Sequence, residues 1–340
     1  MRTRPTKRVT QADVARHANV SQAMVSYVVN KNTTISVPEE TRQRILRAMD
    51  ELGYVPNITA RRLRSSKTLT VAGIIPDITN PFYPAFERGI QDIVDQQGYD
   101  LIMYNTDGSE EKERKYVRSL LQGRVDGLVG VFFHLTARDL RPLIEQNLYV
   151  VRLEATAKQN GTLPIDNVFV DNIAAATTAV THLIERGHRH IGMLTSDYGP
   201  AQRRILGYQR ALEQHGLPQN PAWVQTGDFN EVGGHETMHR LLAQPDQPSA
   251  VFAANDLMAM GAMMAIREAG LTIPDDMAIV GFDDIASSQL VYPALTTIAQ
   301  PQRHMGQRAA EMLFERLLGG IPEAGRSEQI PYELVVRHST

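Results

Sequence analysis

The chain has 340 residues, of which 42% are hydrophobic and 21% charged, as in a globular protein with a buried core. It contains no cysteine, which excludes disulfides, thiolate metal sites and cysteine nucleophiles. The basic N-terminus is not followed by an apolar stretch, and no run approaches the ~18 apolar residues of a membrane span. We therefore expect a cytoplasmic protein with no membrane partner.

The net charge of −3 conceals two parts of opposite sign. Residues 1–67 contain 13 Lys/Arg and 5 Asp/Glu, a net charge of +8, whereas the rest of the chain contains 22 and 33, a net charge of −11. A basic segment attached to an acidic body indicates a polyanion-binding module. A solvated basic tail is the alternative, but helix caps and periodic apolar residues in this segment argue against it.

Three short helices are predicted within the basic segment. Thr10 opens a capping box with an Asp three residues later, and an apolar stripe follows. Ser21 can cap a second helix that ends at Asn30. A third helix is expected from Pro38 to Gly53, with its apolar residues on one face. Two short helices backed by a third form a helix-turn-helix unit.

The second helix of such a unit enters the major groove of DNA, with its N-terminal residues at the base edges. Gln22, Ala23 and Tyr27 point away from the apolar stripe; glutamine can pair with adenine and alanine can contact a thymine methyl group. Polar residues suited to the phosphate backbone complete the expected contacts of this unit: Thr10, Ser21, Ser26, Asn30 and Thr41.

The segments VTQADVARHANVSQAMVSYVVN and VPEETRQRILRAMDELGYVPNITARRLRS resemble the lactose-repressor/galactose-repressor (LacI/GalR) family, and the resemblance continues over nearly the whole chain. It implies a helix-turn-helix domain at 1–56, a hinge helix and linker at 57–67, and an effector-binding core at 68–340. Met24 stands where the family usually has threonine, and Tyr27 where it usually has arginine. The lost arginine removes a guanine-reading fork, so the family's usual operator is not expected.

The resemblance also implies a hinge helix that begins at Asn57. Asn57 would cap it, Ala60 and the arginines would face DNA, and Leu63 of each subunit would enter the minor groove as a wedge. A linker with one incidental leucine is the alternative. A helix this short is marginal alone, so we expect it to fold only on DNA.

From Thr70 onward, nine strand-like apolar runs alternate with helix-length amphipathic segments such as Phe82–Gln97 and Ser109–Gln122. This alternation indicates βαβ units and parallel sheets. The resemblance implies an α/β periplasmic-binding-protein-like core of two doubly wound parallel-sheet subdomains, with chain crossings near Val170, Ile298 and Glu328. The expected subdomains are 68–170 with 299–327, and 171–298 with 328–340.

Several polar residues follow strands at positions that contact effector in the family. Arg204, Asn255 and Asp283 match best. The weaker matches are Phe82, Tyr83, Glu154, Phe229 and Gln300. A carboxylate, an amide and a guanidinium among aromatic rings suit a polyhydroxylated ligand, so we expect a sugar or sugar derivative, with a nucleobase as second choice. Strand-end capping is the alternative, and Asp256 is expected to cap the helix that follows it.

Two features of the sequence point to other functions. His235, Glu236 and His239 spell H-E-x-x-H, the motif of zinc hydrolases, but no third ligand is evident in the sequence. We therefore expect no metal, no cofactor and no enzyme activity. The core alone would also suit a solute-binding receptor, against which the basic helix-turn-helix and the absent secretory signal argue. The chain ends without a heptad tail, so we expect a homodimer on a pseudo-palindromic DNA site.

Overall fold

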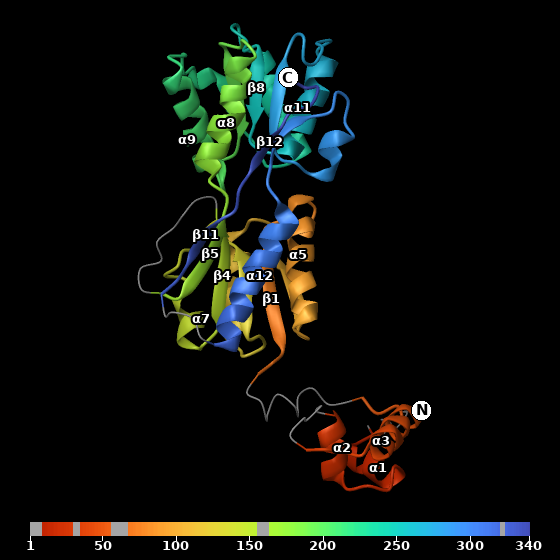
Figure 1. Cartoon of the computed structure of the whole chain (residues 1–340). Helices are drawn as coiled ribbons and strands as arrows, with labels where there is room; N and C mark the ends of the chain where they lie inside the picture. Colours follow the sequence, from red (N-terminus) through yellow and green to blue (C-terminus); the bar gives the residue numbers. More distant parts are fainter. Residues whose placement is uncertain (1–8, 30–34, 56–66, 155–162, 320–323) are drawn as a thin grey trace, which may run out of the picture. The chain divides into compact units, whose positions relative to one another are not determined.

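Figure 1 shows the computed structural model, which describes residues 9–29, 35–55, 67–154, 163–319 and 324–340. The chain divides into two compact units, Met1–Lys67 and Thr68–Thr340. Four of the expected DNA contacts lie outside the described residues: Asn30, Asn57, Ala60 and Leu63. Among the described residues, no helix is long and apolar enough to cross a membrane.

The N-terminal unit contains three helices, α1 (Gln11–His17), α2 (Gln22–Val29) and α3 (Glu39–Glu51). The capping box forms as predicted, because the Thr10 hydroxyl accepts from the Asp13 amide and Asp13 accepts from the Thr10 amide. Ser21 Oγ accepts from the Met24 amide at 3.2 Å and so caps α2. Pro38 occupies the N-cap position of α3 rather than its first turn. The small core of this unit consists of Val14, Ala15, Ala18, Val25, Ile45, Ala48 and Tyr54.

The C-terminal unit contains two six-stranded sheets. The first sheet is all parallel, in the order β2-β1-β3-β4-β5-β11. Its strands are β1 (Thr70–Ile75), β2 (Asp100–Asn105), β3 (Gly127–Val131), β4 (Tyr149–Glu154), β5 (Ile165–Phe169) and β11 (Ser327–Gln329). The helices of this subdomain are α5 (Phe82–Gln96), α6 (Glu110–Leu120), α7 (Arg141–Glu145) and α12 (Gln302–Leu318).

The second sheet has the order β7-β6-β8-β9-β10-β12, in which only the edge strand β12 is antiparallel. Its strands are β6 (Ile191–Thr195), β7 (Val224–Thr226), β8 (Ala250–Ala253), β9 (Ala278–Asp283), β10 (Thr296–Ala299) and β12 (Glu333–Val335). The helices are α8 (Asn172–Glu185), α9 (Ala201–Gln214), α10 (Glu231–Leu242) and α11 (Asp256–Glu268). Helices cover both faces of a doubly wound sheet, which explains why strands such as β1 are apolar at nearly every position.

The chain passes between the two subdomains three times, as Figure 1 shows. The first two crossings follow β5 and β10, close to Val170 and Ile298. The expected third crossing at Glu328 is wrong by a few residues. Glu328 pairs with Val168 in the first sheet, so the chain crosses between Gln329 and Glu333. The family resemblance supplied this crossing, and the polar sequence of β11 has no strand pattern that could have placed it more closely.

A buried salt-bridge cluster connects β5 to the C-terminal segment of the first subdomain. Asp166 is fully buried, and its two carboxylate oxygens accept from Arg316 at 2.6 and 2.8 Å. The same carboxylate accepts from the Arg326 side chain at 2.8 Å and from the Arg326 amide at 2.8 Å. Arg316 is itself 5% exposed, so its charge depends on Asp166 for compensation.

We expect Asp166→Ala to lower the free energy of unfolding by about 3–5 kcal/mol, because it removes a buried carboxylate that forms ion pairs with both Arg316 and Arg326. Chemical denaturation of the purified protein measures this directly. Glu110→Ala is the matched control, since it breaks an exposed i,i+4 ion pair with Arg114 and should cost under about 1 kcal/mol. A similar small loss for both variants would contradict the role given to Asp166.

Candidate functional site

A cavity of about 540 Å³ lies between the two subdomains, at the carboxyl ends of their strands. In each sheet the strand order reverses beside the first strand, β1 or β6, and the segments after these strands and their neighbours β3 and β8 line the cavity. Such switch points are where open α/β sheets bind ligands. The volume falls within the roughly 300–1,000 Å³ of small-molecule sites.

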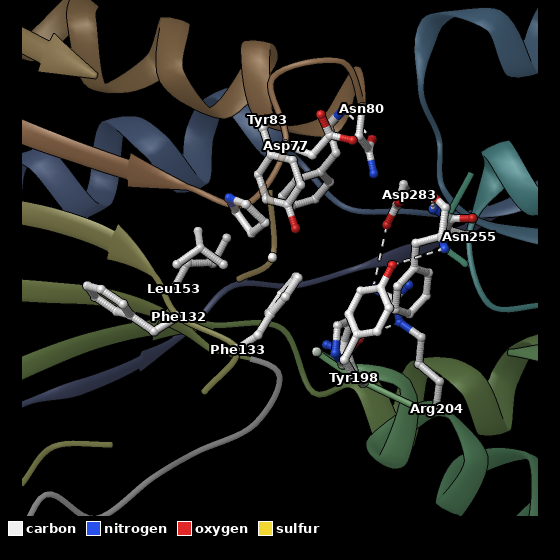
Figure 2. A pocket seen from close by; sticks show the side chains of 18 of the residues that line it. Asp77, Asn80, Tyr83, Phe132, Phe133, Leu153, Tyr198, Arg204, Asn255 and Asp283 are labelled. Carbon is white, nitrogen blue, oxygen red and sulfur yellow. Dashed lines mark hydrogen bonds and ion pairs between the residues drawn. The ribbon is translucent and has the colours of Figure 1, made fainter. Parts of the chain in front are cut away.

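The structure brings all eight residues predicted as effector contacts to this one cavity. The first subdomain contributes Phe82, Tyr83 and Glu154, and the segment that follows β10 contributes Gln300. The second subdomain contributes Arg204, Phe229, Asn255 and Asp283. In Figure 2, Tyr83 and Asp77 lie on one side of the cavity, and Tyr198, Arg204 and Asp283 lie on the other. The two subdomains therefore offer opposed sets of groups to a ligand between them.

Arg204 is held rigidly in the wall of the cavity. Its Nε donates to Asn172 Oδ1 at 2.7 Å, its Nη1 donates to the Ala254 carbonyl, and its guanidinium lies 3.7 Å from the centre of the Phe282 ring. Its Nη2 is 3.6 Å from Asp283 Oδ1. Because its position is fixed on several sides, the guanidinium is preorganised to donate to a ligand oxygen.

Asp283 is the last residue of β9 and is 5% exposed. Its backbone has a φ of 121°, a conformation that residues other than glycine rarely adopt. Gln300 Nε2 donates to Asp283 Oδ1 at 2.8 Å. Burial raises the pKa of the Asp283 carboxyl to about 7, against the opposing attraction of Arg204. This carboxyl therefore titrates in the neutral range, inside the cavity.

Aromatic side chains form much of the remaining wall, and the sequence did not predict two of them. Phe133 follows β3 and Tyr198 follows β6; their ring centroids are 5.7 Å apart, so they meet across the two subdomains. Tyr198 also packs edge-on against Phe229 at 5.4 Å. Figure 2 shows Phe133 and Tyr198 facing each other. Phe133 and Tyr198 lie two and three residues after the ends of β3 and β6, and this nearness to strand ends is the feature of the sequence that could have revealed them.

The loop that carries Phe133 is fixed by a buried carboxylate on α6. Glu113 is fully buried and accepts from the amides of Phe133, His134 and Leu135 at 2.8, 3.2 and 3.0 Å. Further polar residues of the cavity also follow strands and were not predicted: Asp77, Asp107, Asn172 and Asp228. The cavity is thus richer in hydrogen-bonding groups than the sequence indicated.

The predicted capping role of Asp256 is wrong. Asn255 caps α11, since its Oδ1 accepts from the Met258 amide at 2.9 Å, and its Nδ2 donates to the Phe229 carbonyl. Asp256 is fully buried and accepts from the Ile285 amide, Ser288 Oγ and Thr297 Oγ1. Asp256 is therefore a structural group behind the cavity, whereas the neighbouring Asn255 both caps the helix and lines the cavity.

The predicted DNA-reading residues lie at the start of α2 and beside it. Ser21, Gln22 and Ala23 are exposed, and Ser26 and Tyr27 are half-buried. Thr10 is exposed but its hydroxyl is engaged in the capping box, and Thr41 is half-buried on α3. The start of α2 thus exposes Gln22 and Ala23, while Val25 packs into the core of the unit.

The H-E-x-x-H motif lies on α10, away from the residues that line the cavity. The sequence showed no third ligand for His235 and His239, but the structure places Glu268 of α11 beside both. Glu268 lies 29 residues beyond His239 in the chain, so no local pattern could have linked them.

A helix-turn-helix unit joined to a two-sheet core with a ligand-sized cavity defines a class of protein, the ligand-responsive DNA-binding regulators. Comparison with known proteins agrees with this class. Residues 10–57 match the model of bacterial regulatory proteins of the lacI family, and residues 180–340 match the periplasmic binding protein-like domain.

Relatives match over almost the full chain. Catabolite control protein A of Priestia megaterium is 36% identical over 98% of this chain and 99% of its own. The HTH-type transcriptional repressor PurR of Aliivibrio salmonicida is 36% identical over 97% of this chain and 98% of its own. The lac repressor dimer bound to operator and the anti-inducer ONPF is 29% identical, with a TM-score of 0.86 over 98% of this chain and 99% of its own. The regulator CelR in complex with cellobiose is also 29% identical, with a TM-score of 0.72 over 98% and 100%.

The chain belongs to the LacI family of bacterial transcription regulators. It is accordingly a sequence-specific DNA-binding regulator of transcription with a small-molecule site in its core, and the predicted fold, a helix-turn-helix domain with a two-sheet α/β core, is confirmed.

Proposed function

We propose that this regulator is a cytoplasmic repressor that binds a pseudo-palindromic operator as a homodimer and responds to a saccharide bound in the cavity. It performs no catalysis in this role. The single observation that carries the proposal is that Arg204, Asp283 and Asn255, each held by hydrogen bonds to the protein, lie together in a cavity lined by aromatic rings.

A saccharide suits these groups better than a nucleobase. Adjacent hydroxyls can donate to the Asp283 carboxylate and accept from the Arg204 guanidinium, and the apolar face of a sugar ring can stack on Phe133 or Tyr198. Additional carboxylates at Asp77 and Asp228 offer further acceptors for hydroxyl groups. Similar structures hold carbohydrates, since CelR was solved with cellobiose and a regulator from Enterococcus faecium with ribose.

The DNA-reading surface we propose consists of Gln22, Ala23 and Tyr27, with Thr10, Ser21, Ser26 and Thr41 at the phosphates. The exposure of Gln22 and Ala23 supports it. Met24 and Tyr27 differ from the residues usual in the family, so we expect an operator whose half-site does not require a guanine contact at the Tyr27 position. Two-fold symmetry of the dimer makes the operator pseudo-palindromic.

Ligand and operator are coupled through the arrangement of the two subdomains. Opposed groups on the two sides of the cavity favour a closed arrangement when a ligand bridges them. Closure would shift the first subdomains of the dimer and thus the spacing of the hinge segments at 57–67. The coupling free energy of such systems is about 1–3 kcal/mol, equivalent to a change in operator affinity of roughly 5- to 150-fold.

Selection of operator DNA from a random pool tests the proposed DNA function, and a thermal-shift screen of sugars and purines on the same full-length protein tests the cavity. We expect a pseudo-palindromic site bound by a dimer, and stabilisation by at least one sugar. A solute-binding receptor would enrich no sequence. Stabilisation by purines alone would instead make a nucleobase the effector.

A further inference from the structure

Three potential metal ligands converge on the surface of the second subdomain. Nε2 of His235 and Nε2 of His239 lie 3.3 Å apart, as i and i+4 residues of α10. Both lie close to the same oxygen of Glu268, at 2.7 Å from His235 and 3.1 Å from His239. The three atoms therefore form a small triangle of two imidazole nitrogens and one carboxylate oxygen.

This triangle is slightly smaller than a bound transition metal requires. Tetrahedral zinc bonds of about 2.0–2.2 Å place neighbouring ligand atoms about 3.3–3.6 Å apart. The observed separations of 3.1 and 3.3 Å are close to this range, and side-chain rotation would have to widen the 2.7 Å hydrogen bond between His235 and Glu268 by about 0.6 Å for a metal ion to enter. Imidazole and carboxylate together favour Zn²⁺ and its neighbours in the first transition row over Mg²⁺ or Ca²⁺.

The two helices that carry these ligands are held rigidly together. A Cβ atom at Gly234 would lie 2.1 Å from the Met258 carbonyl oxygen, and one at Gly261 would lie 1.9 Å from the Glu231 carbonyl oxygen. Only glycine permits so close an approach of the α10 and α11 backbones. Because backbone packing fixes this relation, the position of Glu268 relative to the two histidines does not depend on a flexible loop.

The triangle is also open to ions from solution. The side chains of His235, His239 and Glu268 are 31%, 47% and 52% exposed. An exposed site with three protein ligands leaves room for water in the remaining positions.

We propose that His235, His239 and Glu268 form a surface site for a divalent transition metal, with Zn²⁺ as the ion that tests it. The metal joins α10 to α11 on the outside of the second subdomain. The N-caps of these helices, Asn230 and Asn255, both line the effector cavity. A bound ion would therefore stabilise a pair of helices whose N-caps line that cavity.

The test uses full-length protein without a polyhistidine tag, treated with EDTA and desalted. Titration calorimetry with Zn²⁺ is expected to show one ion bound per chain, and Co²⁺ is expected to give d–d absorption in the visible range. Zn²⁺ should raise the melting temperature, and EDTA should reverse that rise. His239→Ala and Glu268→Gln should each weaken binding by roughly tenfold or more, since each removes one of three ligands.

His304→Ala is the matched control, because His304 is an exposed histidine on α12 of the first subdomain. It should bind Zn²⁺ as the wild type does. Circular dichroism checks that the variants are folded. We expect Glu268→Gln to fold, because Glu268 lies at the surface. Absence of stoichiometric binding would overturn the proposal. So would wild-type affinity in His239→Ala or in Glu268→Gln, since that would remove the three-ligand set.

Discussion

Asp283→Asn is expected to weaken effector binding about 10- to 100-fold at pH 8, because a hydrogen bond to a charged group contributes about 1.5–3 kcal/mol. The substitution keeps the shape of the side chain and an oxygen that can accept from Gln300, so the wall of the cavity should persist. Titration calorimetry with the sugar found in the screen measures the loss.

Asp284→Asn is the matched control. Asp284 is the next residue, pairs with Arg337 at 2.7 Å and does not line the cavity. Its substitution should leave effector affinity within about twofold of wild type. Equal losses in the two variants would mean that the loop, not the Asp283 carboxylate, determines binding.

The affinity for effector should depend on pH through the titration of Asp283. Burial raises the pKa of Asp283 to about 7, so the carboxylate that accepts ligand hydroxyls is lost as the pH falls through that value. Wild-type affinity should fall about tenfold from pH 8 to pH 6, whereas the affinity of Asp283→Asn should be nearly constant. An unchanged pH profile in the variant would assign the titration to another group.

Stability should depend on pH with the opposite sign. The folded protein holds the Asp283 proton more tightly than the unfolded chain, so this group favours folding below pH ~4 and loses that contribution as the pH rises through about 7. Between pH 5 and pH 8 the wild type should therefore lose about 2.6 kcal/mol of stability relative to Asp283→Asn. Denaturation of both proteins at the two pH values gives this difference.

Ile45→Ala is expected to abolish operator binding while leaving effector binding intact. Ile45 is fully buried on α3, in the small core of the N-terminal unit. Its truncation should cost about 2–5 kcal/mol, which is a large share of the stability of so small a unit. The unfolded unit cannot present α2 to DNA, so operator affinity should fall more than about 100-fold.

Leu46→Ala is its control on the same helix, since Leu46 is 40% exposed. It should retain operator affinity within a few-fold. Because the chain divides at Lys67 and Thr68, the effector affinity of both variants should equal that of the wild type. Loss of effector binding in Ile45→Ala would show that the two units do not fold independently.

The sequence predicted elements best where the determining interactions are local. Thr10 and Ser21 cap their helices through residues three positions away, and both caps form as expected. The nine apolar runs all became strands, because burial on both faces leaves a continuous apolar pattern. The edge strands β7 and β11 were missed, since the sequences VQT and SEQ are polar and depend on a neighbouring strand for their conformation.

The site could be predicted only in part, because several of its residues are placed by contacts with residues distant in the sequence. The eight effector residues were placed by family resemblance, and the structure gathers them at one cavity. Phe133 and Tyr198 lie in loops, whose conformations depend on distant groups such as Glu113. Glu268 meets His235 and His239 only because Gly234 and Gly261 let two helices nearly touch. Contacts of this kind have no periodic pattern in the sequence.

The most direct test of the central claim is the dissociation constant of the selected operator, measured by fluorescence anisotropy with and without saturating effector. We expect a change of at least about fivefold for the wild type and a clearly smaller change for Asp283→Asn at the lowest effector concentration that saturates the wild type. If a sugar that calorimetry shows to bind the protein leaves the operator affinity of the wild type unchanged, ligand binding in the cavity does not control DNA binding.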